Sequence, residues 1–222
     1  YLPEAMMNFL ALLGWSLNDK TEIMSRKELV SNFSLERVSK TAAIFNREKL
    51  DWMNGVYIRS LSLENFTRQA LPFLKKGLPA EASRPLSADY IKRIMPLIQE
   101  RAKTLAEVAE LTEFFFIAEL GYQPELLIAK KMDLKSATKA LAISLARLEK
   151  LEPFDENSLE ALLRPLATEL GLKTGQLFGT LRVAITGRTV APPLFQTMAV
   201  LGREKCLKRI TEALAQLRQT GK

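Results

Sequence analysis

Apolar residues recur three and four positions apart along most of this 222-residue chain, and no stretch of convincing length alternates between apolar and polar residues. The first pattern gathers apolar side chains on one face of an α-helix, whereas a half-buried strand requires the second. The chain therefore predicts an all-α fold. We expect more than ten helices in an elongated array of two to three helical bundles.

Capping residues and prolines predict where several of these helices begin. Ser25 and Thr104 each precede a glutamate by three residues, which is the spacing of a capping box, and the second box should open a helix that reaches about Leu120. Asn157 is expected to cap another helix. Pro192-Pro193 should form the first turn of a further helix, where a missing N–H is tolerated.

Glycines and prolines also divide the chain. The segment 77–85 is rich in helix breakers and is expected to be a mobile loop, and a second break follows at residues 121–124. Gly55 lies inside an apolar helical pattern, which suggests a close helix contact there. We predict a helical segment over residues 1–63 and two helical bundles over 64–120 and 121–222.

Composition narrows the classes of function. With 47% hydrophobic and 26% charged residues, no apolar run of 18 residues and no signal-peptide pattern, the chain is expected to be a cytoplasmic, soluble monomer. It has no histidine and a single cysteine, Cys206, whose helical spacing among apolar residues predicts a packed core position. The lack of histidine argues against a zinc site and against a self-contained hydrolase. No catalytic or phosphate-cradling motif was found.

The net charge of +7 is unevenly distributed. Residues 164–222 hold ten basic and three acidic residues, whereas residues 1–163 hold 22 of each. A basic segment of this kind favours a nucleic-acid partner, although a solvated basic surface explains the charge equally well.

The segment 181–195 concentrates several of these signals. An apolar helical pattern ends at Thr186-Gly187, two arginines lie nearby at Arg182 and Arg188, and Pro192-Pro193 starts the next helix. A helix corner with two arginines and an approaching helix N-terminus attracts anions.

Four blocks of the sequence carry a family resemblance. In chain order they are YLPEAMMNFLALLGWS, ERVSKTAAIFNREKLDWMNGVYIR, QERAKTL and LRVAITGRTVAPPLFQTMAVLG. They resemble the carboxyl-terminal, anticodon-binding part of bacterial glutamyl-tRNA synthetases, over essentially the whole chain but least in 77–87 and 122–153. The block Glu36-Arg37-Val38-Ser39-Lys40 is superficially like the lysine-containing signature loop of class I synthetases, which in the family precedes the first block. We therefore interpret the similarity of this block to the signature loop as coincidental.

The resemblance implies recognition of the tRNA(Glu) anticodon within an α-helix cage. In the family, glutamate activation uses ATP and Mg in an amino-terminal catalytic domain, so this chain is expected to be inactive by itself and to bind no cofactor.

The resemblance also implies site residues. Arg101, in the QERAKTL block, matches an arginine that contacts the third anticodon base, where cytosine in glutamate tRNA replaces guanine in glutamine tRNA. Arg182, Leu194 and Phe195 match anticodon-contacting residues of the second corner, and Ala191 stands where some relatives have threonine. Five further basic residues are expected to contact phosphates, and they are Lys103, Arg188, Lys205, Lys208 and Arg209.

Two other functions stay open at this point. A helical protein-interaction scaffold with a basic carboxyl-terminal surface would share the composition, and an independent enzyme is disfavoured by the missing motifs. The main hypothesis requires the corners of Arg101 and Arg182 to form one cradle for three unstacked nucleotides.

Overall fold

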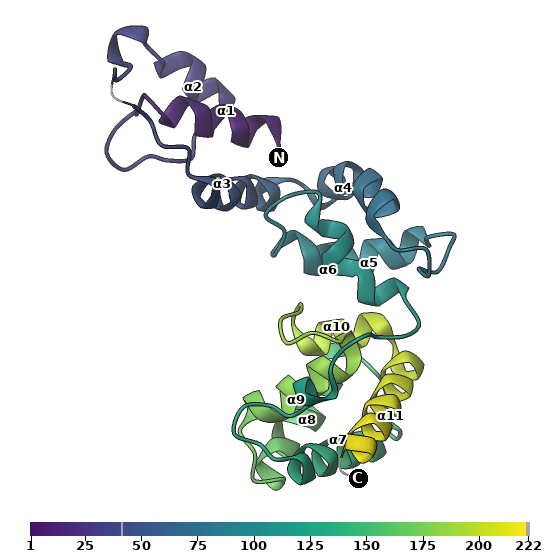
Figure 1. The fold of residues 1–222 in the computed structure, drawn as a ribbon. Coiled ribbons are helices and arrows are strands. Elements are labelled where there is room, and N and C mark those ends of the chain that lie inside the picture. Colours follow the sequence, from purple (N-terminus) through teal and green to yellow (C-terminus); the bar gives the residue numbers. More distant parts are fainter. Residues whose placement is uncertain (41, 221–222) are drawn as a thin grey trace. The chain divides into compact units, whose positions relative to one another are not determined.

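The computed structural model describes residues 1–40 and 42–220, and all regular structure in this part of the chain is helical (Figure 1). The helices, two of them 3-10 helices (η), are α1 (Pro3–Leu12), α2 (Arg26–Asn32), η1 (Leu35–Arg37), α3 (Arg47–Ser60), α4 (Leu63–Gly77), α5 (Ala88–Gln99), α6 (Glu107–Phe116), η2 (Pro124–Leu127), α7 (Leu134–Leu148), α8 (Glu156–Glu169), α9 (Thr174–Thr186), α10 (Leu194–Leu201) and α11 (Arg203–Thr220). The predicted all-α fold with more than ten helices is confirmed.

Several helices begin where the capping residues predict. The Ser25 hydroxyl accepts a hydrogen bond from the Glu28 N–H at 3.2 Å, and the Glu28 carboxylate accepts one from the Ser25 N–H at 2.8 Å, which completes the capping box of α2. At the starts of α3 and α4, the side chains of Asn46 and Ser62 accept the N–H groups of Lys49 and Asn65. These side chains satisfy N–H groups that a helix leaves without partners.

Two other helix starts differ from the prediction. Asp155, not Asn157, caps α8, because its carboxylate accepts the Ser158 N–H at 2.8 Å. Helix α10 begins at Leu194 with Pro193 as its N-cap, so Pro192-Pro193 precedes the helix. A residue before proline is disfavoured in helical conformation, which keeps Pro192 out of the first turn.

Helix α6 is shorter than expected at both ends. It begins at Glu107, whose carboxylate accepts the N–H groups of Lys103 at 2.9 Å and Thr104 at 3.4 Å. It ends at Phe116 instead of continuing to about Leu120. The Phe116 carbonyl at the end of the helix accepts the Ser83 N–H at 2.8 Å, which is a tertiary hydrogen bond to the segment before α5.

The chain divides into two compact units. Unit 1 comprises Tyr1–Leu78 and Ile98–Leu111, and unit 2 comprises Pro79–Leu97 and Thr112–Lys222. These boundaries differ from those of the segments 1–63, 64–120 and 121–222, which stay a prediction. Within the loop 77–85 the side chains of Leu78 and Ala82 are buried.

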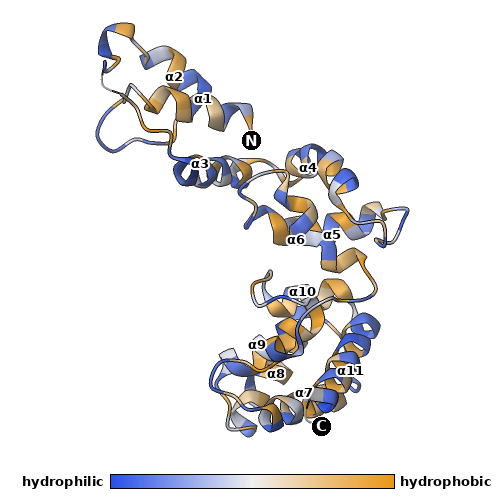
Figure 2. Ribbon diagram, in the orientation of Figure 1, coloured by the Kyte–Doolittle hydropathy of each residue, from blue (hydrophilic) through white to orange (hydrophobic). Residues whose placement is uncertain are grey.

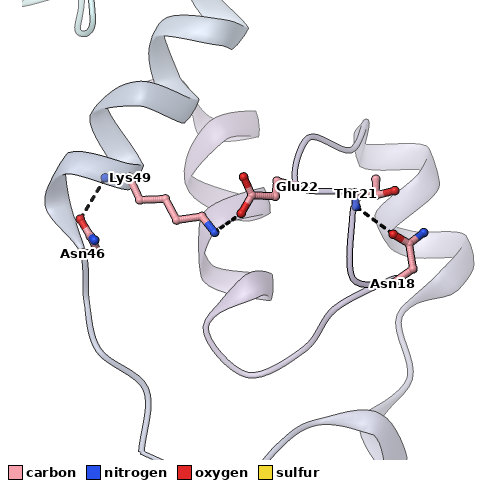
Figure 3. Close-up of polar contacts among 5 residues, drawn as sticks. All are labelled: Asn18, Thr21, Glu22, Asn46 and Lys49. Atoms are coloured by element: carbon pink, nitrogen blue, oxygen red, sulfur yellow. Dashed lines mark hydrogen bonds and ion pairs between the residues drawn. The ribbon is translucent and has the colours of Figure 1, made fainter.

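The amino-terminal part of unit 1 has two small hydrophobic clusters. Phe9, Leu50 and Met53 form one, and Trp15, Met24 and Leu29 form the other. Outside these clusters, the Lys49 ammonium lies 2.5 Å from a Glu22 carboxylate oxygen and thereby ties α3 to the loop before α2 (Figure 3).

Unit 2 packs α11 against α7 and α9, and α10 against α8. Its helices turn hydrophobic faces inward, as the alternation of orange and blue along α7 and α11 shows (Figure 2). Phe114, Phe115 and Phe116 are buried, and Cys206 is 0% exposed, which confirms the predicted core position of Cys206. No helix among the described residues is long and apolar enough to cross a membrane.

Candidate nucleic-acid interface

Arg101 lies in a tight turn directly after α5. The N–H groups of Arg101 and Ala102 both donate to the Ile98 carbonyl at 2.9 Å. Ala102 is fully buried, whereas the Arg101 side chain is exposed. The turn therefore fixes the backbone of Arg101 while its guanidinium stays accessible.

Helix α3 packs against the backbone of this turn. The buried Asn54 donates from Nδ2 to the Lys103 carbonyl at 2.5 Å. A Cβ at Gly55 would lie 3.5 Å from the Ala102 carbonyl oxygen and 3.7 Å from the Lys103 Cα. The close approach expected at Gly55 is present, but the partner is the backbone of this turn and not another helix. Lys103 itself is exposed beside Arg101.

Gln99 adds a further restraint. Its side-chain amide donates to the carbonyls of Ile58 at 2.9 Å and Leu61 at 2.8 Å, where α3 ends. Because Gln99 is nearly buried at 8% exposure, these two bonds hold the end of α5 against the end of α3. The backbone at Arg101 therefore needs little ordering on binding a ligand, and only the side chain has to become fixed.

The second corner follows α9 in unit 2. Gly187 ends the helix in the left-handed conformation with φ 71°, and its N–H donates to the Val183 carbonyl at 2.7 Å. The Thr186 hydroxyl donates to the Arg182 carbonyl at 2.7 Å and accepts the Arg188 N–H at 3.2 Å. This is a glycine-terminated helix end that fixes the direction in which the chain leaves.

Arg188 turns toward unit 2 itself. Its Nη2 lies 2.8 Å from the Glu113 Oε2, and its guanidinium lies 6.0 Å from the ring centroid of Phe114. A cavity of about 240 Å³ adjoins the pair and is lined in part by Leu120 and Thr186. The predicted phosphate contact of Arg188 would therefore have to compete with Glu113.

Arg209 is buried, which contradicts its predicted contact with phosphate. It is 1% exposed, and its guanidinium donates to the carbonyls of Ile185 at 2.6 Å, Phe114 at 2.7 Å and Ile117 at 2.9 Å. These carbonyls lie at or just beyond the ends of α9 and α6, where helices carry partial negative charge. Arg209 thus joins α11 to the carboxyl-terminal ends of α6 and α9. The end of α9 carries the Arg182–Arg188 corner.

The two lysines of α11 that were predicted to contact phosphate differ in their surroundings. Lys205 is half-buried and donates to the Phe115 carbonyl at 2.9 Å, and burial lowers the pKa of its ammonium. Lys208 is exposed and lies 3.7 Å from the carboxylate of Glu212 one turn away. Lys205 is therefore engaged inside the unit, whereas Lys208 keeps the exposure that a phosphate contact requires.

The other predicted residues of the second corner are less exposed than Arg101. Arg182 and Ala191 are half-buried, and Leu194 is 5% exposed at the start of α10. Phe195 is half-buried and meets Phe178 edge to face, with ring centroids 5.1 Å apart. Arg182 lies on α9 and Leu194 and Phe195 lie on α10, two helices that pack together, and the role of these residues in base recognition stays a prediction.

The structure thus assembles each corner within one unit. Arg101 and Lys103 belong to unit 1, whereas Arg182, Arg188, Leu194 and Phe195 belong to unit 2. The single cradle formed by both corners stays a prediction. Sequence reasoning missed Asn54, Gln99 and Glu113, because their partners are distant in sequence and no local pattern marks them.

Comparisons with known proteins agree with this arrangement. Residues 65–214 match the family described as "Anticodon binding domain", a range that includes Arg101 and the second corner. Residues 1–52 match the family described as "tRNA synthetases class I (E and Q), catalytic domain". This second match covers only the first 52 residues of the chain.

The relatives described next are both named glutamate–tRNA ligase. The chain is 58% identical over 217 residues to the glutamate–tRNA ligase of Dehalococcoides mccartyi strain CBDB1, with 98% of this chain and 45% of the relative covered. It is 51% identical over 218 residues to that of Roseiflexus castenholzii, with 98% and 43% covered. The chain therefore spans less than half the length of these relatives.

Solved structures show the same fold. The crystal structure of a glutamate tRNA ligase from Elizabethkingia meningosepticum in complex with its amino acid superimposes with a TM-score of 0.79 at 26% identity, over 98% of this chain and 42% of that one. The glutamate-tRNA synthetase from Elizabethkingia anophelis gives a TM-score of 0.74 at 32% identity, over 97% and 41%.

Proposed function

Because this chain belongs to the anticodon binding domain family, we propose that it recognises the anticodon of tRNA(Glu) as part of a glutamate–tRNA ligase. The observation that carries the proposal is the family match over residues 65–214, which contains both arginine-bearing corners. The relatives' shared name supports the choice of tRNA.

Arg101 would read the third anticodon base. A guanidinium donates only, so it favours cytosine, which offers the acceptors O2 and N3 on its pairing edge, over a purine that presents donors there. The backbone hydrogen bonds around residue 101 and the exposure of its side chain suit this role. Arg182 would contact the other bases, while Leu194 and Phe195 would provide apolar surface. With Ala191, no hydroxyl is offered at that position.

Ligation itself would involve the remainder of such a ligase. ATP and Mg would bind there, and the chain would serve as a monomeric tRNA-binding portion. The experiment for this part is glutamate-dependent exchange of pyrophosphate into ATP, which we expect to be undetectable with this chain alone.

Binding of two anticodon stem-loops tests the proposal. Stem-loops of glutamate and glutamine tRNA, identical except at the third anticodon base, should bind with different affinities, the glutamate version more tightly. Arg101→Gln should bring the two affinities together without loss of stability. Lys103→Gln is the matched control, because it removes a neighbouring positive charge and should weaken both RNAs equally. Absence of any base preference in the unmodified chain would instead support a basic interaction scaffold.

A further inference from the structure

Five exposed lysines of unit 2 lie outside the Arg182–Arg188 corner. Lys130 and Lys131 precede α7, Lys135 and Lys139 lie one turn apart on α7, and Lys173 precedes α9. We call them the lysine cluster. The net charge placed the excess positive charge in residues 164–222. Two basic residues of that segment, Lys205 and Arg209, form hydrogen bonds inside unit 2 and do not add to an exposed basic surface.

One glutamine holds the two loops of the lysine cluster together. The Gln176 side-chain amide donates to the carbonyls of Lys131 at 3.0 Å and Lys130 at 3.4 Å. Its side-chain oxygen accepts the Lys173 N–H at 2.9 Å. Main-chain segments about 40 residues apart are therefore fixed side by side, and their lysines with them.

The backbone of the lysine cluster is strained at Lys131. Lys131 has φ 65° and is the one non-glycine residue with positive φ in the described part of the chain. A left-handed conformation costs an ordinary residue about 1–2 kcal/mol, and neighbouring ammonium groups repel one another. Unusual backbone conformations that the surroundings hold in place are concentrated at functional sites.

The positive charge of the lysine cluster is not balanced by ion pairs. Over residues 1–40 and 42–220, none of the five ammonium groups lies within 4.0 Å of a carboxylate in an ion pair. The nearest acid in sequence, Asp133, accepts the Ser136 N–H at 2.7 Å and caps α7. The lysine cluster therefore offers a concentrated positive surface to an anionic partner.

We propose that the lysine cluster binds the phosphate backbone of the tRNA outside the anticodon, and this inference rests on the proposed function. The cluster adjoins the first residue of α9, whereas the Arg182–Arg188 corner lies at its last turn, and 13 helical residues span roughly 20 Å. A folded RNA is long enough to reach both ends. Ammonium groups act on phosphates as point charges, so they should add salt-sensitive affinity without base preference.

A charge-neutral variant tests the inference. The variant K130Q/K131Q/K135Q/K173Q removes four charges and is compared with K20Q/K27Q/K92Q/K150Q, which removes four exposed charges elsewhere. Affinity for a tRNA(Glu) transcript is measured across a salt series. In the first variant we expect at least a tenfold loss near 0.1 M salt and a salt slope shallower by about 3. The control should resemble the unmodified chain, and the preference for the glutamate anticodon should persist in all three.

The outcomes separate the two proposals. If the unmodified chain binds no tRNA, the proposed function fails and this inference fails with it. If it binds and discriminates, but the first variant keeps the same affinity and slope, only the lysine cluster is refuted. An equal loss in the control would also refute it, since the effect would then be one of net charge.

Discussion

Arg188 and Glu113 form an ion pair inside unit 2, with Nη2 and Oε2 2.8 Å apart and the two side chains 28% and 34% exposed. The pair joins the residue after the Gly187 turn to α6. The guanidinium of Arg188 therefore serves first to fix the corner, and only a strongly anionic ligand would draw it away.

A double-mutant cycle measures this pair. Arg188→Ala, Glu113→Ala and the double variant should show a coupling of about 1 kcal/mol in the free energy of unfolding, because the pair is partly shielded from water. Urea denaturation gives the four values. Additive effects of the two single substitutions would show that the pair does not stabilise the corner.

Arg209→Met should destabilise the chain far more than a surface substitution. It leaves two buried carbonyls and one half-buried carbonyl without their charged donor, and each such bond contributes about 1.5–3 kcal/mol. We expect a loss of at least about 3 kcal/mol in urea denaturation. Lys208→Met is the adjacent control and should change stability by less than about 1 kcal/mol, because the Lys208–Glu212 pair is exposed. Similar losses for both variants would contradict the structural role of Arg209.

Arg209 also shows where sequence reasoning stops. Its three acceptors are main-chain carbonyls, which every residue has, and they lie 24 to 95 positions away in the chain. Nothing in the sequence distinguishes this buried arginine from the exposed Arg101. Charge counting therefore overestimated the basic surface of the carboxyl-terminal segment, and it missed the lysine cluster, whose members are separated in sequence.

Local sequence signals predicted the helices more reliably than charge predicted the exposed basic surface. The helical periodicity and the capping box at Ser25 depend on neighbours within a few residues, and the structure confirms them. The errors at α6 and α8 arose where a tertiary contact or a second capping candidate competed with the local pattern. The role of Arg101 came from family resemblance and is untested, while its rigid support on α3 could be found only in the folded chain.

Stability should fall in alkaline solution. Burial raises the pKa of Cys206 from 9.0 to about 12, and that of Tyr90 from 10.0 to about 12. The folded state then retains protons that the unfolded state releases, so the stability that these two groups contribute is constant below about pH 9 and falls as the pH rises toward 12. The slope contributed by Cys206 approaches about 1.4 kcal/mol per pH unit. Urea denaturation at pH 8 to 10.5 checks this, and Cys206→Ala should flatten the early part of the fall. A profile that stays level to pH 10.5 would contradict it.

Two glycines with left-handed backbones offer a matched test of the Gly187 corner. Gly187 has φ 71° and Gly171 has φ 67°, so alanine is strained at both, by about 1–2 kcal/mol. A Cβ at Gly187 would lie 3.3 Å from Tyr122 Cδ1 and 3.5 Å from Leu120 Cβ, whereas a Cβ at Gly171 would meet nothing within 4 Å.

We therefore expect Gly187→Ala to lower the free energy of unfolding by more than Gly171→Ala does, because only the first substitution also displaces packed neighbours. The corner that carries Arg182 should shift as well, so Gly187→Ala should weaken binding of tRNA(Glu) severalfold at a temperature where both variants are folded. Gly171→Ala should leave that affinity unchanged. If both variants lose equal stability and bind RNA equally well, the packing behind Gly187 does not hold the corner in place, and the proposed anticodon surface of unit 2 loses its support.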